Sequence, residues 1–248
     1  MKVLVLGHNG MLGHMVVKYL RSKDVLVYTM EKRWPLNQQG IKTFNGDYII
    51  NCIGAIPQRT DEFNINWELP IWLDLNAPCK VIHPGTDCEM DNDMYGVSKN
   101  VAANYIRTSS KQTKSLKTSI IGPELNGNDS LLEWFLSQED EVFGYTKAIW
   151  NGNTTLEWAK QCLELMNNWD SIKYLNETII STEPVNKYEL LLIMKHVFNK
   201  EITITPKDLG KDKCLEGIID TGNILDQLIE LKKFMEVTPC PEIENDDI

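Results

Sequence analysis

The stretch Val3-Leu4-Val5-Leu6-Gly7-His8-Asn9-Gly10-Met11-Leu12-Gly13 decides the fold of this 248-residue chain. Its first four residues form a continuous apolar run, which is typical of a strand buried on both faces of a parallel sheet. Apolar residues at helical spacing follow over residues 11–20, so the glycines stand between a strand and a helix. The stretch therefore predicts a strand–turn–helix unit at the start of the chain.

The three glycines of this turn each have a separate physical reason to be glycine. Gly7 allows a tight turn, Gly10 lets backbone N–H groups approach a pyrophosphate, and Gly13 lets the helix pack close to the sheet. The helix N-terminus adds partial positive charge for phosphates. Three incidental turn glycines are the alternative. We interpret the turn as a dinucleotide phosphate loop, in which we expect cofactor contacts from Gly7, Asn9, Gly10, Met11 and Leu12.

Strands alternate with helices along the first half of the chain. Strands are predicted over residues 25–28, 48–53, 80–83 and 115–121, and helices over residues 66–75 and 92–106. This alternation favours a parallel sheet that is covered on both faces. After Gly122 the pattern changes, with helices predicted over residues 130–138, 155–166 and 187–198 and a strand over 178–180. Asn186 is the expected N-cap of the last helix, with Glu189 at its third position.

We therefore predict the α/β fold class, with a Rossmann-like doubly wound parallel sheet and a small C-terminal substrate-binding lobe. The sheet domain is expected to span residues 1–121, with residues 145–180 returning to it. The small lobe is expected to contain residues 122–144 and 181–248.

Composition excludes several classes of function. A net charge of −10 argues against sequence-independent binding of nucleic acid, which requires a basic face. No apolar run approaches the roughly 18 residues that a membrane span requires. The six cysteines are scattered without a CxxC pair, which favours reduced thiols and no metal site. We expect a cytoplasmic protein without a nucleic-acid or membrane partner.

The residues after the second predicted strand bear on the choice of cofactor. A carboxylate there would hold the ribose hydroxyls of NAD, whereas a cation would meet the 2′-phosphate of NADP. The sequence reads Glu31-Lys32-Arg33. We favour NADPH on the strength of Lys32 and Arg33, with NADH also possible; a solvated charged turn is the alternative.

A second motif, Tyr95-Gly96-Val97-Ser98-Lys99, supplies candidate chemistry. Its i,i+4 spacing places a phenol and an ammonium on one face of a helix. The lysine would lower the phenol's pKa and bind the nicotinamide ribose, so that the tyrosine exchanges a proton with a carbonyl or alcohol. Thr86, which follows the preceding strand, can hydrogen-bond the same substrate oxygen. An ordinary surface pair is the alternative, because YxxxK sequences are common by chance.

With these motifs, the chain resembles the extended short-chain dehydrogenase/reductases, and within them the dTDP-4-dehydrorhamnose reductase family. Most of the chain carries the resemblance. It rests on residues 7–13, 48–54 (YIINCIG), 82–88 with 95–99, 118–138 (TSIIGPELNGNDSLLEWFLSQ) and 148–159 (AIWNGNTTLEWA) with 181–191 (STEPVNKYELL).

The resemblance implies reduction of the 4-keto group of a nucleotide-linked 4-keto-6-deoxy sugar by NADPH or NADH. A homodimer is compatible with it. Thr86, Tyr95 and Lys99 match the family's catalytic set. The cofactor residues beyond the loop would be Lys32, Arg33, Cys52, Gly54, Tyr95 and Lys99, and the substrate residues Asn66, Cys88, Ile121 and Trp150.

Three departures from the family leave alternatives open. Thr86 and Tyr95 are only nine positions apart, whereas the family has a longer segment there that covers the active site. A non-catalytic nucleotide-binding or regulatory protein is therefore the runner-up, although the retained Tyr95 and Lys99 count against it. Lys117 stands where an arginine is usual. Cys88 occupies the position of an epimerisation base in related epimerase/reductases; a small buried cysteine is the alternative.

Overall fold

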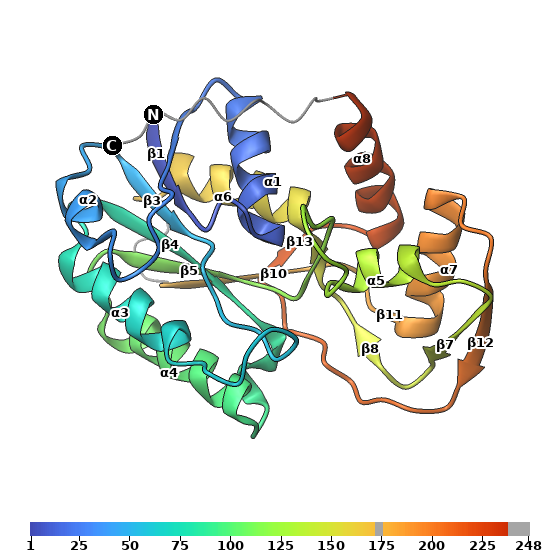
Figure 1. Ribbon diagram of the computed structural model, residues 1–248. Helices are drawn as coiled ribbons and strands as arrows, with labels where there is room; N and C mark the ends of the chain where they lie inside the picture. Colours follow the sequence, from blue (N-terminus) through green and yellow to red (C-terminus); the bar gives the residue numbers. More distant parts are fainter. Residues whose placement is uncertain (172–175, 238–248) are drawn as a thin grey trace.

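The computed structural model describes residues 1–171 and 176–237. A seven-stranded sheet forms its centre, with strand order β13-β10-β5-β4-β3-β1-β2 (Figure 1). Every pair of neighbouring strands in it is parallel, which confirms the predicted fold class. The strands are β1 (Lys2–Leu6), β2 (Leu26–Thr29), β3 (Tyr48–Asn51), β4 (Lys80–Gly85), β5 (Thr113–Lys117), β10 (Glu177–Ser181) and β13 (Ile219–Asp220).

The continuous apolar run of β1 is explained by burial on both faces of the sheet. Val3 and Val5 pack with α1 (Met11–Arg21) and α6 (Thr155–Asn167). Leu4 and Leu6 point the other way, into a core shared with α2 (Gln38–Thr43) and α3 (Ile65–Asn76). The helix α4 (Met94–Ser109) lies beside α3 on that second face (Figure 1).

The order of the strands places a topological switch point at the carboxyl ends of β1 and β3. From β1 the chain moves outward to β2, and it then returns across β1 to form β3 on the other side. In doubly wound sheets, ligands bind where the strand order reverses in this way. The phosphate loop after β1 and the loop after β3 therefore border the expected cofactor site.

The small lobe lies beside the carboxyl ends of the central strands (Figure 1). A core that includes Phe135, Trp150 and Leu190 holds it together and continues to Met15 of α1. Its two-stranded sheets pair β7 with β12, β8 with β11 and β6 with β9. The elements are β6 (Ile120–Ile121), α5 (Leu131–Ser137), β7 (Glu141–Tyr145), β8 (Ile149–Trp150), β9 (Asn153–Thr154), β11 (Val185–Asn186), α7 (Lys187–Phe198), β12 (Thr203–Lys207) and α8 (Ile224–Val237).

The structure corrects one predicted strand. Residues 115–121 do not form a single strand, because β5 ends at Lys117 and Ile120–Ile121 pairs with β9 instead. The chain leaves the sheet at Thr118, whose hydroxyl accepts a hydrogen bond of 2.9 Å from the Asn153 amide. The predicted cap of α7 is confirmed, because Asn186 and Glu189 form a reciprocal capping box.

The described residues end before the C-terminus of the predicted small lobe. Residues 238–248, which the sequence assigns to the small lobe, lie outside the described residues. Within the described residues, the search for a helix both long and apolar enough to cross a bilayer finds none.

Candidate active site

The phosphate loop has the geometry that its glycines predict. Gly7 has a φ of +78°, and a Cβ there would lie 2.9 Å from the Cys52 carbonyl carbon. A Cβ on Gly13 would lie 2.1 Å from the Gly7 carbonyl oxygen, so α1 packs directly on the turn. Gly10 is different, because the nearest atom to its Cβ position is the Gly7 oxygen at 3.4 Å. The space beside Gly10 is therefore open to a phosphate, and the loop fits the pyrophosphate of a dinucleotide.

The other predicted loop contacts differ in how they could meet a cofactor. Asn9 is exposed and Met11 is half-buried. The Leu12 side chain lies in the core between the sheet and α1. The Cys52 side chain packs against the same core, and burial raises the pKa of its thiol. The Leu12 side chain is therefore directed away from a cofactor, whereas the Cys52 side chain is only partly buried.

Three charged residues follow β2. Lys32 and Arg33, on which the expectation of NADPH rests, are both exposed. The Glu31 carboxylate contacts the phosphate loop, with Oε1 at 3.1 Å from Nε2 of His8. Glu31 is thus in contact with the phosphate loop.

Thr86 and Tyr95 lie together at the carboxyl end of β4. Thr86 caps a short 3₁₀ helix, η1 (Asp87–Met90), and its Oγ1 accepts from the Cys88 N–H at 3.3 Å. Tyr95 is in the first turn of α4, where Gly96 packs on η1 so closely that a Cβ would lie 2.6 Å from the Cys88 carbonyl oxygen. The Tyr95 phenol is thereby brought near the Thr86 side chain, whose Oγ1 donates to Asp87 Oδ1 at 3.1 Å.

The Tyr95 phenol is a proton donor rather than an acceptor at neutral pH. Burial raises its pKa to about 12, and the negative charge of Asp87 acts in the same direction. The Thr86 side chain opposes this shift. Phe63, from the loop after β3, covers the phenol ring edge to face, with ring centroids 5.8 Å apart.

Lys99 lies on the same helix but is directed at the end of β4. Its ammonium donates to the Pro84 carbonyl oxygen at 3.5 Å. Burial lowers its pKa, whereas the nearby Glu89 charge and Cys88 raise it. The structure thus places Thr86 near Tyr95, whereas the Lys99 ammonium contacts the backbone of β4.

A buried ion pair beneath Thr86 was missed by sequence reasoning. The Glu89 carboxylate accepts from the Thr86 N–H at 3.0 Å and from the Lys117 ammonium at 2.5 Å. Glu89 is 2% exposed and Lys117 is 6% exposed. Lys117, noted above as a departure from the family, therefore helps fix the backbone of a candidate catalytic residue. The Thr-x-x-Glu spacing from Thr86 to Glu89 is a capping-box signal that would have revealed half of this arrangement.

Asn66, a predicted substrate residue, is buried and fully engaged with the protein. Its Oδ1 accepts from the Ala55 N–H at 2.8 Å, and its Nδ2 donates to the Ala55 carbonyl oxygen and to Ser98 Oγ. A Cβ on Gly54 would lie 3.4 Å from the same Oδ1. Asn66 therefore fixes the loop after β3 against α4, and its contact with a substrate remains a prediction.

The short segment between Thr86 and Tyr95 is covered by the lobe. Residues 207–217, which begin at the last residue of β12, bring two lysines to Asp91: Lys213 Nζ lies 2.5 Å and Lys211 Nζ 2.6 Å from its carboxylate. Lys213 also donates to Cys88 Sγ at 3.5 Å. Burial raises the pKa of the Cys88 thiol, although Lys213 opposes the shift. Cys88 is therefore a thiol at neutral pH, not the thiolate that an epimerisation base requires.

Lys187 is a third lobe lysine near this segment. It is the first residue of α7, and its Nζ lies 4.7 Å from the centroid of the Trp150 ring. Burial lowers its pKa to about 8, with the Asp87 charge opposing. Trp150 and Ile121, both predicted to bind substrate, are each 2% exposed within the lobe core. Trp150 thus packs against Lys187, a contact for which no local sequence pattern exists.

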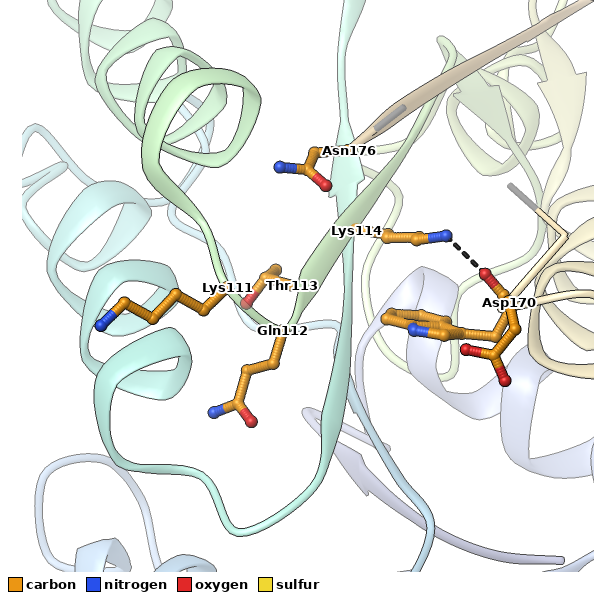
Figure 2. A pocket seen from close by; sticks show the side chains of 7 residues that line it. Lys111, Gln112, Thr113, Lys114, Asp170 and Asn176 are labelled. Carbon is orange, nitrogen blue, oxygen red and sulfur yellow. Dashed lines mark hydrogen bonds between the residues drawn. The ribbon is translucent and has the colours of Figure 1, made fainter. Parts of the chain in front are cut away.

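A polar hollow at the start of β5 is a separate feature (Figure 2). In it, Lys114 Nζ donates to the Trp169 carbonyl oxygen at 2.7 Å. It lies where β5 begins, at the amino edge of the sheet, whereas the phosphate loop and Thr86 follow the carboxyl ends of β1 and β4. We therefore do not include this hollow in the candidate site.

No family model matches the chain, and no curated protein matches it. Solved structures do match it over nearly its whole length. A dTDP-4-dehydrorhamnose reductase from Clostridium acetobutylicum has a TM-score of 0.74 at 16% identity, covering 95% of this chain and 100% of that chain. The enzyme of the same name from Bacillus anthracis, in complex with NADP, has a TM-score of 0.76 at 14% identity, with coverage of 94% and 99%.

A UDP-glucose 4-epimerase from Thermotoga maritima, with UDP-glucose, is also similar. Its TM-score is 0.69 at 13% identity, covering 95% of this chain and 99% of that chain. At such identities the likeness concerns the fold. The chain has the fold of the extended short-chain dehydrogenase/reductases, and dTDP-4-dehydrorhamnose reductases are among the solved structures that share it.

Proposed function

We propose that this protein is a nicotinamide-dependent reductase of the 4-keto group of a nucleotide-linked 4-keto-6-deoxy sugar. The observation that carries the proposal is that Thr86, at the end of β4, and Tyr95, in the first turn of α4, are brought near each other by the packing of Gly96 on η1. This pair follows β4, on the same edge of the sheet as the open phosphate loop after β1. A proton donor beside a dinucleotide site is the arrangement that carbonyl reduction requires.

Each side chain of the candidate site has a separate role in the proposed reduction. A bound nicotinamide supplies the hydride that C4 receives. The Tyr95 phenol, with its pKa raised to about 12, stays protonated until it gives its proton to the carbonyl oxygen. The Thr86 hydroxyl orients that oxygen, and Glu89 fixes the Thr86 backbone. The Lys99 ammonium stabilises the tyrosinate that proton transfer leaves.

Two lysines of the lobe favour the binding of an anionic substrate. Lys187 and Lys213 reach the segment after Thr86 in a chain whose net charge is −10. Two lysines placed there favour the diphosphate that links a nucleotide to a sugar. Some of the solved structures that share the fold are reductases of a dTDP-linked sugar by name.

The test is an assay of turnover with a panel of substrates. The protein is mixed with reduced nicotinamide cofactor and dTDP-, UDP- or GDP-linked 4-keto-6-deoxyhexoses, and loss of the nicotinamide absorbance is followed. We expect oxidation that depends on one of the sugars and is absent from Tyr95→Phe. Cofactor binding without oxidation by any sugar would instead favour a non-catalytic binding protein.

A further inference from the structure

An ion-pair contact joins the loop after β3 to the lobe. Arg59, in the loop that leaves the carboxyl end of β3, donates from Nε to Asp129 Oδ2 at 2.7 Å and from Nη2 to Glu124 Oε1 at 3.0 Å. Both carboxylates belong to the lobe segment between β6 and α5. We call this contact the Arg59 clamp. It connects segments that the fold positions separately, since 65 and 70 positions separate its members.

The lobe side of the clamp is fixed without the arginine. The second oxygen of Glu124, Oε2, accepts from the Asp129 N–H at 2.7 Å and from the Ser130 N–H at 2.9 Å. The Glu124 side chain is 5% exposed, whereas that of Arg59 is 49% exposed. Water can replace the carboxylates around a half-exposed guanidinium, so the clamp can open while the lobe segment keeps its own hydrogen bonds.

Both ends of the clamp adjoin the phosphate loop. The loop that carries the arginine begins at Cys52, whose carbonyl carbon lies 2.9 Å from the Cβ position of Gly7. On the lobe side, Glu124 lies near His14 in the first turn of α1: burial lowers the pKa of the His14 ring, and the Glu124 charge raises it. Nδ1 of His14 is 2.9 Å from the Gly10 carbonyl oxygen. The clamp therefore connects two segments that each lie beside the loop expected to hold the pyrophosphate.

We propose that the Arg59 clamp controls entry and exit of the dinucleotide, so that the cofactor binds and leaves only while the clamp is open. This inference rests on the proposed dinucleotide site. Opening of a contact that closes over a ligand limits release in many enzymes. A clamp that closes both the free and the loaded protein slows association and dissociation by the same factor, because only the open fraction exchanges cofactor. The affinity then depends little on the clamp, unlike the effect of a residue that holds the cofactor itself.

Rates of cofactor binding test the proposal without any sugar. NADPH and NADH are each mixed with the protein in stopped flow, following energy transfer from tryptophan to the nicotinamide, and dissociation is started with an excess of the oxidised form. Arg59→Gln removes both ion pairs, so association and dissociation should each become about threefold faster or more, while Kd changes by less than about twofold. Arg107→Gln is the matched control. Arg107 pairs with Glu177 at 3.5 Å, at the amino end of β10, and its loss should leave both rates unchanged.

A second variant separates the clamp from a simple effect of charge. Asp129→Asn weakens the clamp from the lobe side by removing a negative charge, whereas Arg59→Gln removes a positive one. Both variants should raise both rates, Asp129→Asn by the smaller factor because Glu124 still holds the arginine. Attraction of the pyrophosphate by local charge would instead make the two variants change Kd in opposite directions.

Each variant is compared with the wild type by its unfolding temperature. Unchanged rates in both variants, opposite changes of Kd, or slower association with faster dissociation in Arg59→Gln would overturn the inference alone. Binding of neither cofactor by the wild-type protein would overturn both the inference and the proposed function.

Discussion

Burial acts on Tyr95 and Lys187 by the same mechanism with different consequences. Removing a group from water disfavours its charged form. The pKa of the Tyr95 phenol therefore rises to about 12, and that of the Lys187 ammonium falls to about 8. At neutral pH both groups carry their protons. Only Lys187 loses its proton within the range in which the protein would be assayed.

We expect Lys187 to govern the alkaline side of the pH profile. As the pH rises through about 8 the ammonium is lost, so kcat/KM for an anionic substrate should fall. Lys187→Met should remove this limb and lower kcat/KM at pH 7 by about tenfold or more, the range expected for a charged hydrogen bond. Lys233→Met, at an exposed position in α8, is the control. If kcat/KM of Lys187→Met still fell at alkaline pH as it does in the wild type, the role assigned to Lys187 would be contradicted.

At the scale of residues, the sequence predicted contacts between side chains that are close together along the chain. The sequence predicted that Thr86 and Tyr95 lie near each other, as they do in the structure, whereas the Lys99 ammonium is directed at the Pro84 carbonyl oxygen. The pair between Asp91 and Lys213 could not be predicted, because 122 positions separate its members and neither has a local pattern. The contact between Lys187 and Trp150 depends in the same way on how α7 meets β8.

Two glycines of the β1–α1 turn should respond to the same substitution in opposite ways. Gly13→Ala places a Cβ 2.1 Å from the Gly7 carbonyl oxygen, so α1 must shift and unfolding free energy should fall by about 1–3 kcal/mol. Gly10→Ala meets its nearest atom at 3.4 Å and should change stability by less than about 0.5 kcal/mol. It should still weaken cofactor binding, because the Cβ occupies the space of a phosphate.

Urea unfolding and cofactor titration of both variants check this prediction. The wild-type protein serves as the reference for each measurement. Loss of stability in Gly10→Ala equal to that in Gly13→Ala would show that the two glycines are not distinguished by packing. Unchanged cofactor binding in Gly10→Ala would show that the open space beside Gly10 is not the phosphate site.

At the scale of elements, strong local signals predicted α7 to the residue, because its apolar period and its cap agree. The apolar residues around 115–121 gave one predicted strand where the structure has β5 and β6. Hydropathy does not show where a chain leaves a sheet; the hydrogen bond from Asn153 to Thr118 decides that. The two-residue strands β8, β9 and β11 are too short for any periodicity to appear.

The whole molecule explains why the short segment after Thr86 is compatible with a closed active site. In the family that the sequence resembles, a longer segment covers the site. Here residues 207–217 of the lobe cover the segment, through Lys211 and Lys213 on Asp91. The hydrogen bonds from these lysines lower the pKa of Asp91. The contact therefore persists above the ordinary carboxyl pKa of about 3.9 and is lost as the pH falls through the lowered value.

We predict that Asp91→Asn affects the substrate more than the fold. The lysines are partly exposed, so the unfolding free energy should fall by less than about 1 kcal/mol. The lobe segment loses its anchor near Cys88, and KM for the sugar nucleotide should rise several-fold while the cofactor Kd stays the same. Steady-state kinetics and cofactor titration separate these effects. A raised cofactor Kd with unchanged KM would contradict the assigned role of the contact.

At this scale the α/β class, the doubly wound sheet and the lobe were predictable, because alternating strands and helices constrain topology strongly. The cover over the site could not be predicted from the sequence. Its position depends on contacts between the lobe and η1, and the residues in these contacts are far apart along the chain.

The central claim is hydride transfer to a sugar carbonyl with Tyr95 as the proton donor. The most direct measurement is a single turnover with nicotinamide cofactor deuterated at C4 of its ring, followed by mass spectrometry and NMR of the sugar nucleotide. We predict deuterium at C4 of the product sugar with the wild-type protein and none with Tyr95→Phe, which should still bind the cofactor. Deuterium incorporation by Tyr95→Phe at the wild-type rate, or none by the wild-type protein with any of the sugar nucleotides, would contradict the claim.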